Sequence, residues 1–230
     1  MGKRPKICLS LNCKDLKEVK AELEEFMPYA DMVELCSDKL DKIEEMGKDE
    51  YISLLKIVKE STEKRELIVD FKGEDELQNR VLRWSIGIAN YIDIDYGNPI
   101  GDELIKEAKT NNTKVIMSFH NFDRMLSSEE VKEQYENMGK SDADILKIAC
   151  YANKNEDMYE VLNGALNYSS QEGAKDIIAI AMGKEGEESR ICMGDFGSVI
   201  SYACGSKETA PGQFNAKKIS EYINKYYENN

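Results

Sequence analysis

Eight short apolar runs constrain the fold of this chain more than any other feature of its sequence. They are rich in Ile and Val, are bounded by polar residues, and alternate with charge-rich segments. The runs cover residues 6–12, 31–36, 66–72, 91–95, 114–120, 144–150, 176–182 and 199–204. Runs of this kind are typical of strands that are buried on both faces of a parallel sheet. Because eight such strands close a barrel, the pattern predicts an α/β fold, a (β/α)8 TIM barrel.

Helical patterns fill most of the gaps between these runs. They occur at residues 14–29, 127–138 and 216–228. Strand–helix alternation favours a parallel sheet with right-handed crossovers. An open doubly wound sheet is the competing architecture, but no G-x-G-x-x-G loop follows the first run and no Walker-type loop is present, which disfavours its nucleotide-binding versions. No long linker or low-complexity tract divides residues 1–230, so we expect a single domain.

The charge and the cysteine pattern exclude several classes of protein. The formal net charge of −13 argues against a nucleic-acid partner, because binding to phosphates needs a basic surface. No apolar stretch is long enough to span a membrane, and the N-terminal segment lacks the apolar region of a signal peptide, so we expect a cytoplasmic protein. The six cysteines include no C-x-x-C pair, and there is one histidine, which argues against a zinc site.

Lys147 lies inside an apolar run, which is an unusual position for a lysine. Its neighbours in ADILKIAC are mostly apolar, so its amine is expected to lose hydration, and that loss lowers the pKa of an ammonium group. A neutral amine in a pocket is what attack on a carbonyl requires. A lysine that lies at a sheet edge or reaches solvent is the alternative, and the run by itself leaves both interpretations open.

His120 is the only histidine in the chain, and it ends the run that precedes the run of Lys147. Neighbouring strands of a barrel would bring its imidazole near the amine of Lys147, with Ser118 on the same face as His120. Histidine is the side chain best suited to move protons near neutral pH. A purely structural histidine is the alternative, but the pairing with Lys147 favours a catalytic role.

Arg190 and Gln213 follow the seventh and eighth runs, at the end of the barrel where active sites lie. A guanidinium group forms bidentate bonds with a carboxylate, and a glutamine amide binds a hydroxyl or carboxylate oxygen. Each is also a common type of surface residue, so neither side chain by itself identifies a site.

Several segments together resemble those of type I 3-dehydroquinate dehydratase, the Schiff-base dehydratase of the shikimate pathway. They span nearly the whole chain in the family's order: VELCSD (33–38), YIDID (91–95), VIMSFHNF (115–122), ADILKIA (143–149), IAMGKEGEESR (180–190), FGSVISYACG (196–205) and TAPGQ (209–213). The combination of S-x-H-x-F, D-x-x-K-I-A, G-x-x-S-R and A-P-G-Q is specific to this family. The resemblance implies a (β/α)8 barrel that forms a homodimer and uses no metal or organic cofactor.

The resemblance also implies the catalytic roles. Lys147 would form the imine with the ketone of a small anionic carbonyl substrate, 3-dehydroquinate. His120 would be the general acid and base that moves the proton next to the imine and assists loss of water, and Asp95 would orient it. Arg190 would bind the substrate carboxylate. A protonated imine withdraws electrons, so it acidifies the neighbouring C–H bond that the histidine must break.

Further residues are assigned to substrate binding by the same resemblance. Glu34 would bind substrate hydroxyls, and Ser10 is also assigned to substrate binding. Gln213 would hold a substrate oxygen, with Thr209 or Ala210 at the rim of a closing loop.

The chain departs from the family pattern at three positions of the expected pocket. Cys36 replaces the arginine of E-x-R on the second strand, and Lys72 replaces the arginine that ends the third strand, where it would bind substrate. Asp95 replaces the glutamate of D-x-E and is one methylene shorter. A lysine keeps the charge of arginine but loses its bidentate fork. Two alternatives to 3-dehydroquinate dehydration therefore remain: a Schiff-base enzyme for another small carbonyl acid, and a weakly active paralogue that binds a metabolite or a protein.

Overall fold

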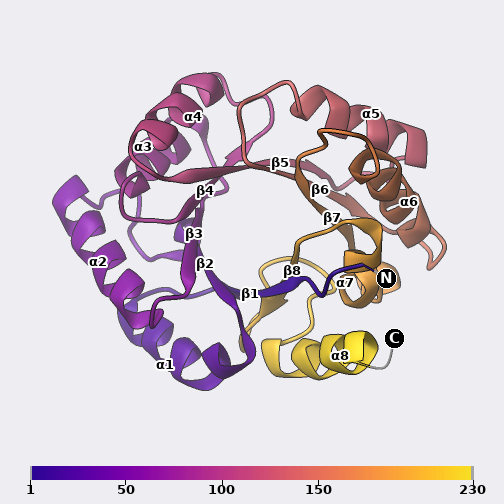
Figure 1. Cartoon of the computed structure of the whole chain (residues 1–230). Coiled ribbons are helices and arrows are strands. Elements are labelled where there is room, and N and C mark those ends of the chain that lie inside the picture. The colour runs from indigo at the N-terminus through magenta and orange to yellow at the C-terminus, as the bar shows by residue number, and fades with distance from the viewer. Residues whose placement is uncertain (1, 229–230) are drawn as a thin grey trace.

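Eight parallel strands and eight helices alternate along the chain and form a barrel, which Figure 1 shows in a view down its axis. The computed structural model describes residues 2–228. The strands are β1 (Lys6–Leu11), β2 (Met32–Cys36), β3 (Glu66–Asp70), β4 (Tyr91–Asp95), β5 (Lys114–Asn121), β6 (Ile145–Tyr151), β7 (Asp176–Met182) and β8 (Ile200–Cys204). All eight predicted strands are confirmed, and so is the (β/α)8 fold.

The strands follow the spatial order β7-β6-β5-β4-β3-β2-β1-β8, and every pair is parallel. The ring closes between β7 and β8 through a single bridge, Ile177 to Ser198, and a 2.9 Å hydrogen bond from Val199 N to Ile177 O. The register between β5 and β6 pairs Ser118 with Lys147. The closed, parallel arrangement brings the C-terminal ends of all eight strands to one end of the barrel.

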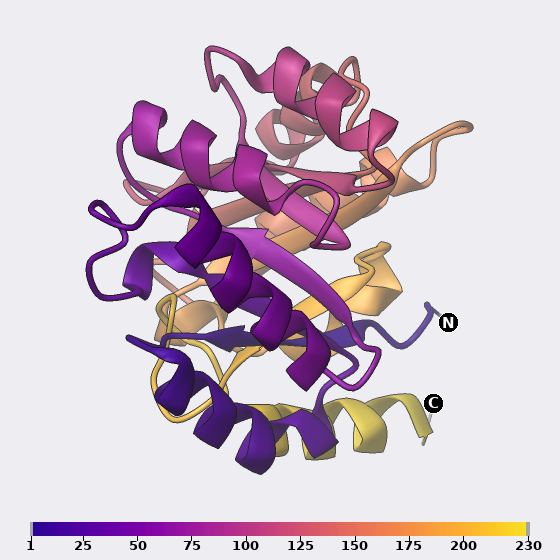
Figure 2. The same ribbon diagram turned by 90° about the vertical axis from the view of Figure 1, so that its left-hand side faces the viewer.

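Helices surround the strands on the outside. They are α1 (Leu16–Phe26), α2 (Lys48–Ser61), α3 (Asp75–Ser85), α4 (Gly101–Thr110), α5 (Ser128–Met138), α6 (Asp157–Ser169), α7 (Ser189–Cys192) and α8 (Ala216–Glu228), with 3-10 turns at Met27–Tyr29, Ser37–Lys39, Lys184–Gly186 and Met193–Phe196. Each of the longer helices buries one apolar face against the strands, as the sequence pattern predicts. Figure 2 shows both termini on the side of the barrel at which β1 begins, opposite the site described below.

Some predicted boundaries are wrong by a few residues, for identifiable reasons. The helix predicted at residues 14–29 begins at Leu16, because the Asp15 side chain accepts a hydrogen bond from Glu18 N and caps it. It ends at Phe26, and a 3-10 turn that contains Pro28 continues the chain. The third run, predicted to reach Lys72, is a strand only as far as Asp70.

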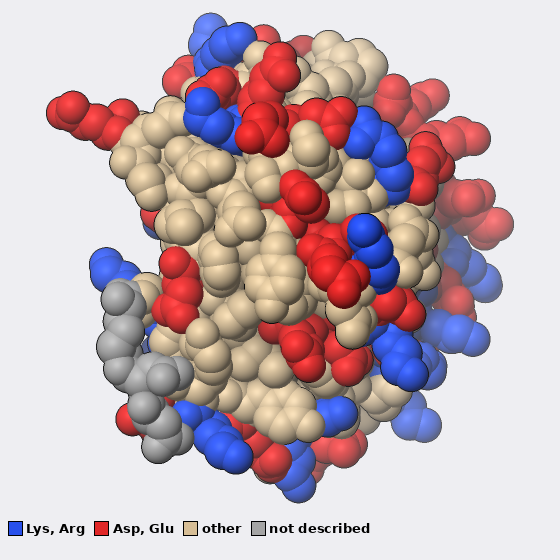
Figure 3. Space-filling model, turned by 90° about the vertical axis from the view of Figure 1, so that its right-hand side faces the viewer, with Lys and Arg blue, Asp and Glu red and all other residues tan. Residues whose placement is uncertain are grey.

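The outer surface is rich in acidic groups, but charges of both signs are mixed on the face shown in Figure 3. This arrangement suits a hydrated exterior. Among residues 2–228, no helix combines the length and the apolar character that crossing a membrane requires.

Candidate active site

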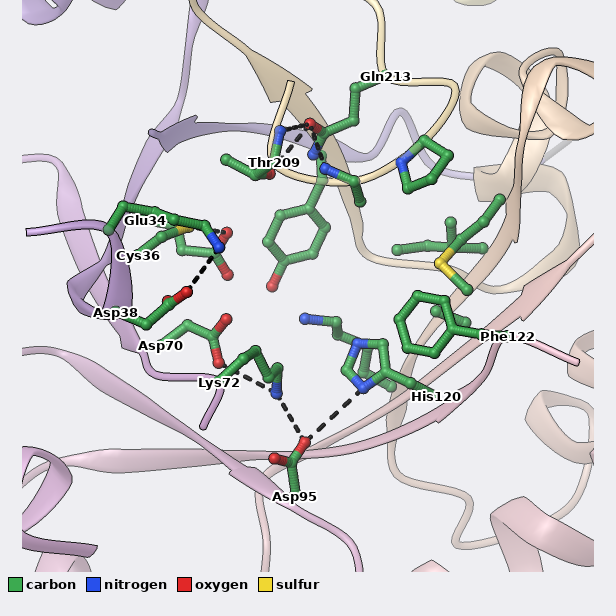
Figure 4. A pocket seen from close by; sticks show the side chains of 18 of the residues that line it. Glu34, Cys36, Asp38, Asp70, Lys72, Asp95, His120, Phe122, Thr209 and Gln213 are labelled. Carbon is green, nitrogen blue, oxygen red and sulfur yellow. Dashed lines mark hydrogen bonds and ion pairs between the residues drawn. The ribbon is translucent and has the colours of Figure 1, made fainter. Parts of the chain in front are cut away.

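A cavity of about 360 Å³ opens at the C-terminal ends of the strands. Its wall combines side chains from β2 to β8 and from the loops that follow them, and Figure 4 shows them pointing toward a common centre. Thirteen of the residues that line the cavity carry ionisable or polar side chains, whereas most of the buried residues of the protein are apolar. Such a concentration of polar groups in a concave site is typical of an active site.

Lys147 lies deep in this cavity on β6, and its side chain contacts a buried carboxylate. Its Nζ donates a 2.8 Å hydrogen bond to Asp93 Oδ2, and it lies 4.6 Å from the centre of the Tyr202 ring. The residue is 6% exposed and Asp93 is fully buried. The amine therefore faces the cavity interior and is not a lysine that reaches bulk water.

The predicted lowering of the Lys147 pKa is wrong for the unliganded protein. Burial does lower the pKa, but the negative charges of Asp93, Glu34 and Asp70 outweigh it, and the net pKa lies well above its usual value. The run around Lys147 shows the burial but gives no sign of three carboxyl groups on other strands. The amine is thus held as an ammonium ion that must lose its proton before it attacks a carbonyl.

His120 lies near the end of β5, the strand next to β6, and forms a row of ionisable groups with Asp95 and Lys72. Its Nδ1 lies 3.7 Å from Asp95 Oδ1, and the same oxygen is 2.6 Å from Lys72 Nζ. Burial lowers the pKa of His120, the ammonium groups of Lys147 and Lys72 lower it further, and Asp95 opposes this effect. The imidazole is consequently neutral near pH 7 and able to accept a proton.

A glutamine on helix α3 holds Asp95 in place. Gln78 is buried and donates hydrogen bonds through Nε2 to Phe71 O at 2.7 Å and to Asp95 Oδ2 at 2.8 Å. Its own Oε1 accepts a 2.8 Å hydrogen bond from Asn98. The shorter Asp95 side chain is therefore anchored on both oxygens, by Lys72 and by Gln78, which fixes the carboxylate that faces His120.

Replacing Gln78 by methionine, which has a similar size, is expected to lower kcat about 10- to 100-fold by releasing Asp95 and hence the imidazole. The acid limb of the pH–rate profile should also shift, because His120 would sense a displaced carboxylate. The matched control is Asn79→Ala on the same helix, which contacts Asn98 but not Asp95. Steady-state kinetics across pH provide the measurement, and equal effects of the two substitutions would contradict a positioning role.

Glu34 on β2 is a buried carboxyl group with spare hydrogen-bonding capacity. It accepts a 2.6 Å hydrogen bond from Ser10 on Oε2, and the Cys36 thiol lies 3.7 Å from the same oxygen. Its Oε1 is buried and accepts no hydrogen bond from the described residues. Burial raises the pKa of Glu34 to about 7, and nearby Asp70 adds to the rise while Lys147 opposes it.

The raised pKa of Glu34 gives a testable effect on stability. The folded protein holds this proton up to about pH 7, whereas the unfolded chain releases it near 4.5, so the free energy of unfolding falls as pH rises through this window. The contribution is about 2 to 3 kcal/mol. In Glu34→Gln this fall should be absent. Urea denaturation of both proteins at pH 5 and pH 8 measures it, and identical pH dependence would show that Glu34 titrates normally.

Arg190 on α7 is a buried cation without a carboxylate partner. It is 1% exposed and donates hydrogen bonds only to backbone carbonyls, from Nε to Gly212 at 2.9 Å and from its terminal nitrogens to Tyr202 and Pro211 at 3.3 Å. No acidic side chain of residues 2–228 forms an ion pair with it within 4.0 Å. Burial lowers the pKa of Arg190 to about 10, so it stays charged near neutral pH. A fixed, unpaired guanidinium in a cavity wall is suited to bind an anion.

Gln213 organises the loop that borders the cavity after β8. Its Oε1 accepts hydrogen bonds from Thr209 N at 2.8 Å, Thr209 Oγ1 at 3.0 Å and Ala210 N at 3.2 Å. The loop is therefore folded back on this one side chain, and both Gln213 and Thr209 line the cavity (Figure 4).

Comparison with known proteins gives the family. A sequence profile described as type I 3-dehydroquinase matches residues 7–230. The chain belongs to the type I 3-dehydroquinase family. Among curated members, a 3-dehydroquinate dehydratase from Methanococcus maripaludis is 30% identical over 94% of this chain and 98% of that protein. One from Escherichia coli is 29% identical over 94% of this chain and 90% of that protein.

Solved structures of 3-dehydroquinate dehydratases share the barrel. The 3-dehydroquinate dehydratase from Aquifex aeolicus has a TM-score of 0.80 at 25% identity, over 96% of this chain and 99% of that chain. The enzyme from Clostridium difficile has a TM-score of 0.87 at 23% identity, over 100% of this chain and 96% of that chain. The resemblance inferred from the sequence motifs is thus confirmed.

The residues predicted for a type I 3-dehydroquinase site lie together in one region. Eight of them line the cavity: Lys147, His120, Asp95, Glu34, Arg190, Gln213, Lys72 and Thr209. Ser10 is not part of its lining and contacts it only through Glu34. Lys72 lies beyond the end of β3, but its amine still reaches Asp95 and, at 3.1 Å, Asp70.

The sequence interpretation missed Asp93 and Asp70, and a signal for both is present. Each is a carboxylate inside an apolar run, two residues before a predicted site residue, and period-two alternation puts such pairs on one face of a strand. Gln78 had no such signal, because a buried glutamine on a helix looks like any polar helical residue. Among residues 2–228, no three His, Cys, Asp or Glu side chains are arranged to hold a metal ion.

Proposed function

We propose that this chain dehydrates 3-dehydroquinate to 3-dehydroshikimate through an imine on Lys147. One observation carries the proposal most: the buried amine of Lys147 opens into the same cavity as a neutral imidazole and an unpaired guanidinium. Amine, proton carrier and anion site are the three groups that the reaction needs. Membership of the type I 3-dehydroquinase family supports the substrate.

The first stage of the mechanism forms the imine. Asp93, which is hydrogen-bonded to Lys147 at 2.8 Å, is the acceptor placed to take the proton from the ammonium. The neutral amine adds to the substrate ketone, and a proton moves from its nitrogen to the ketone oxygen to give the carbinolamine. Asp93 then returns its proton to the carbinolamine hydroxyl, which leaves as water, and the nitrogen lone pair forms the protonated imine. Arg190 holds the substrate carboxylate and so fixes the ring over the amine.

The second stage removes water from the substrate ring. Neutral His120 takes a proton from the carbon next to the imine, and the electron pair of the broken C–H bond moves toward the imine nitrogen. That pair then returns to form a carbon–carbon double bond as the hydroxyl on the next carbon leaves, and His120 returns its proton to that hydroxyl to give water. Hydrolysis of the imine by a second water molecule releases the enone and restores Lys147.

A direct assay tests the proposal, because the product has a conjugated enone that absorbs ultraviolet light and the substrate does not. Purified protein mixed with 3-dehydroquinate should give a steady increase in absorbance. A second candidate function, Schiff-base chemistry on another small carbonyl acid, is favoured by one observation: the thiol of Cys36 contacts Glu34 where the family pattern has an arginine. No product from 3-dehydroquinate, together with turnover of another keto acid, would support that candidate instead.

Replacing Arg190 by lysine is expected to raise KM for 3-dehydroquinate about 10- to 100-fold with a smaller effect on kcat. The lysine keeps a positive charge but loses the planar fork and the three hydrogen bonds to backbone carbonyls that fix it. Steady-state kinetics give the two constants separately. If KM is unchanged, the substrate carboxylate binds elsewhere in the cavity.

The proposal includes a homodimer in the cytoplasm, with no nucleic-acid or membrane partner. The dimer is carried over from the family resemblance. A reducing compartment suits the six cysteines, all of which are free and five of which are buried. Light scattering on the purified protein measures the oligomeric state.

A further inference from the structure

Asp70 is a buried carboxylate in the cavity wall for which the steps above provide no role. It ends β3, its Cα is paired in register with that of Cys36 on β2, and it lines the cavity with 7% of its surface exposed. Figure 4 shows it beside Glu34 and Cys36, on the side of the cavity away from Gln213 and its loop. Its place in the wall makes it available to a bound molecule.

The hydrogen-bonding capacity of Asp70 is largely unused. Its only contact with a charged group is the 3.1 Å ion pair with Lys72, and Oδ1, which makes that contact, has no partner with hydrogen-bond geometry among the described residues. Lys72 is more closely bound to Asp95, at 2.6 Å. Glu34 also has unused hydrogen-bonding capacity, because its buried Oε1 has no hydrogen-bond partner among the described residues. Two neighbouring buried carboxyl groups with free acceptor atoms are costly unless a ligand supplies the missing donors.

We propose that Asp70 is a specificity-determining residue that, together with Glu34, forms a subsite for the substrate hydroxyl on the carbon next to the reacting ketone. This inference rests on the proposed function. In the unliganded protein Glu34 Oε1 and Asp70 Oδ1 are buried without a hydrogen-bond donor among the described residues. In the complex the substrate hydroxyl donates its single hydrogen bond to Asp70, beside Glu34.

The charges around the pair decide which chemical group fits. A substrate anion is repelled by two carboxyl groups. A substrate ammonium is repelled by Lys72 and Lys147, whose positive charges already face the pair. A neutral hydroxyl donates one hydrogen bond without adding charge, so it is the group that this part of the wall accepts.

The position of the pair relative to Lys147 decides which hydroxyl is bound. Glu34, Asp70 and Lys147 line the same cavity, and the charges of both carboxyl groups raise the pKa of the Lys147 amine. The imine carbon will therefore lie beside them, and the substrate hydroxyl nearest to it is on the adjacent carbon. Cys36, which stands where the family pattern has an arginine, is paired in register with Asp70 and leaves this part of the wall without a guanidinium donor.

The test compares 3-dehydroquinate with an analogue that lacks this hydroxyl, in the wild type, Asp70→Ala and Asp70→Asn. The wild-type protein should have a kcat/KM about 10- to 100-fold lower for the analogue, the range expected for hydrogen bonds to charged groups. In Asp70→Ala, kcat/KM should fall for 3-dehydroquinate but not for the analogue, so most of the preference is lost. Asp70→Asn keeps one acceptor oxygen, and its preference should lie between those of the wild type and Asp70→Ala. Asp176→Asn, an exposed position at the opposite end of the barrel, is the matched control and should keep the full preference.

Each outcome has a defined meaning. Equal losses on both substrates in Asp70→Ala would show that Asp70 only supports the fold or Lys72, and would overturn the subsite. A wild-type protein that does not distinguish the two substrates would overturn it as well. Borohydride reduction of the imine distinguishes failure of the proposed function from failure of the Asp70 subsite. No adduct and no turnover of 3-dehydroquinate by the wild type would reject the proposed function. Normal wild-type turnover, with substrate selectivity unchanged in the Asp70 variants, would reject only the role of Asp70.

Discussion

Replacing Lys147 by alanine is expected to lower turnover of 3-dehydroquinate about 10⁴-fold or more, because no other amine of residues 2–228 lies where an imine can form beside His120. Lys72 is the other lysine of the inner cavity, but its amine is held between Asp95 at 2.6 Å and Asp70 at 3.1 Å. The enone assay measures the loss. Residual activity near the wild-type level would mean that the reaction does not pass through Lys147.

The Lys147 experiment needs a control for folding. Removing the ammonium leaves fully buried Asp93 with only its longer ion pair to Lys72, at 3.7 Å. Breaking the closer pair costs up to about 3 to 5 kcal/mol. Lys147→Arg keeps a cation opposite Asp93 but cannot form an imine, so it should lose turnover while keeping more of the stability. If the arginine variant retained turnover, the positive charge and not the nucleophile would be the essential property.

Replacing His120 by glutamine is expected to lower kcat about 10²- to 10⁴-fold while imine formation persists. The imidazole moves the proton after the imine has formed, so the substitution slows the second stage, in which water is lost from the substrate ring. The pKa of His120 lies below its usual 6.5, because burial and the charges of Lys147 and Lys72 disfavour its protonated form. Protonation of this base should therefore lower the wild-type kcat/KM only at pH values below its usual 6.5.

The pH profile distinguishes the role of His120 from a structural one. In His120→Gln the acid limb should disappear, whereas a variant that merely distorts the site would lose activity with the limb intact. Near-normal turnover in His120→Gln would show that another group carries the proton.

Much of the barrel was predictable from the sequence because each strand is a separate apolar run. Strands that are buried on both faces of a parallel sheet consist mainly of apolar residues, and eight such runs are present. The segment between two successive runs is long enough for one helix. The site followed from the same logic, since polar residues such as Lys147 and His120 stand out inside or at the end of an apolar run. The sequence therefore predicted where along each strand the site residues lie.

The protonation states and the connecting hydrogen bonds were not predictable in this way. The pKa of Lys147 depends on Asp93, 54 residues away, and on two further carboxyl groups, so its direction is decided by contacts across the barrel. Gln78 lies on a helix, and the distribution of apolar and polar residues along a helix does not show which polar side chain is buried. The orientation of Arg190 depends on backbone carbonyls of a loop, which no side-chain pattern records.

Borohydride reduction in the presence of 3-dehydroquinate, followed by mass spectrometry of the peptides, tests the central claim most directly. A stable adduct is expected on the peptide that contains Lys147, dependent on substrate, and absent from the alanine variant. Steady turnover with no trapped adduct, or an adduct on Lys72 in place of Lys147, would contradict it.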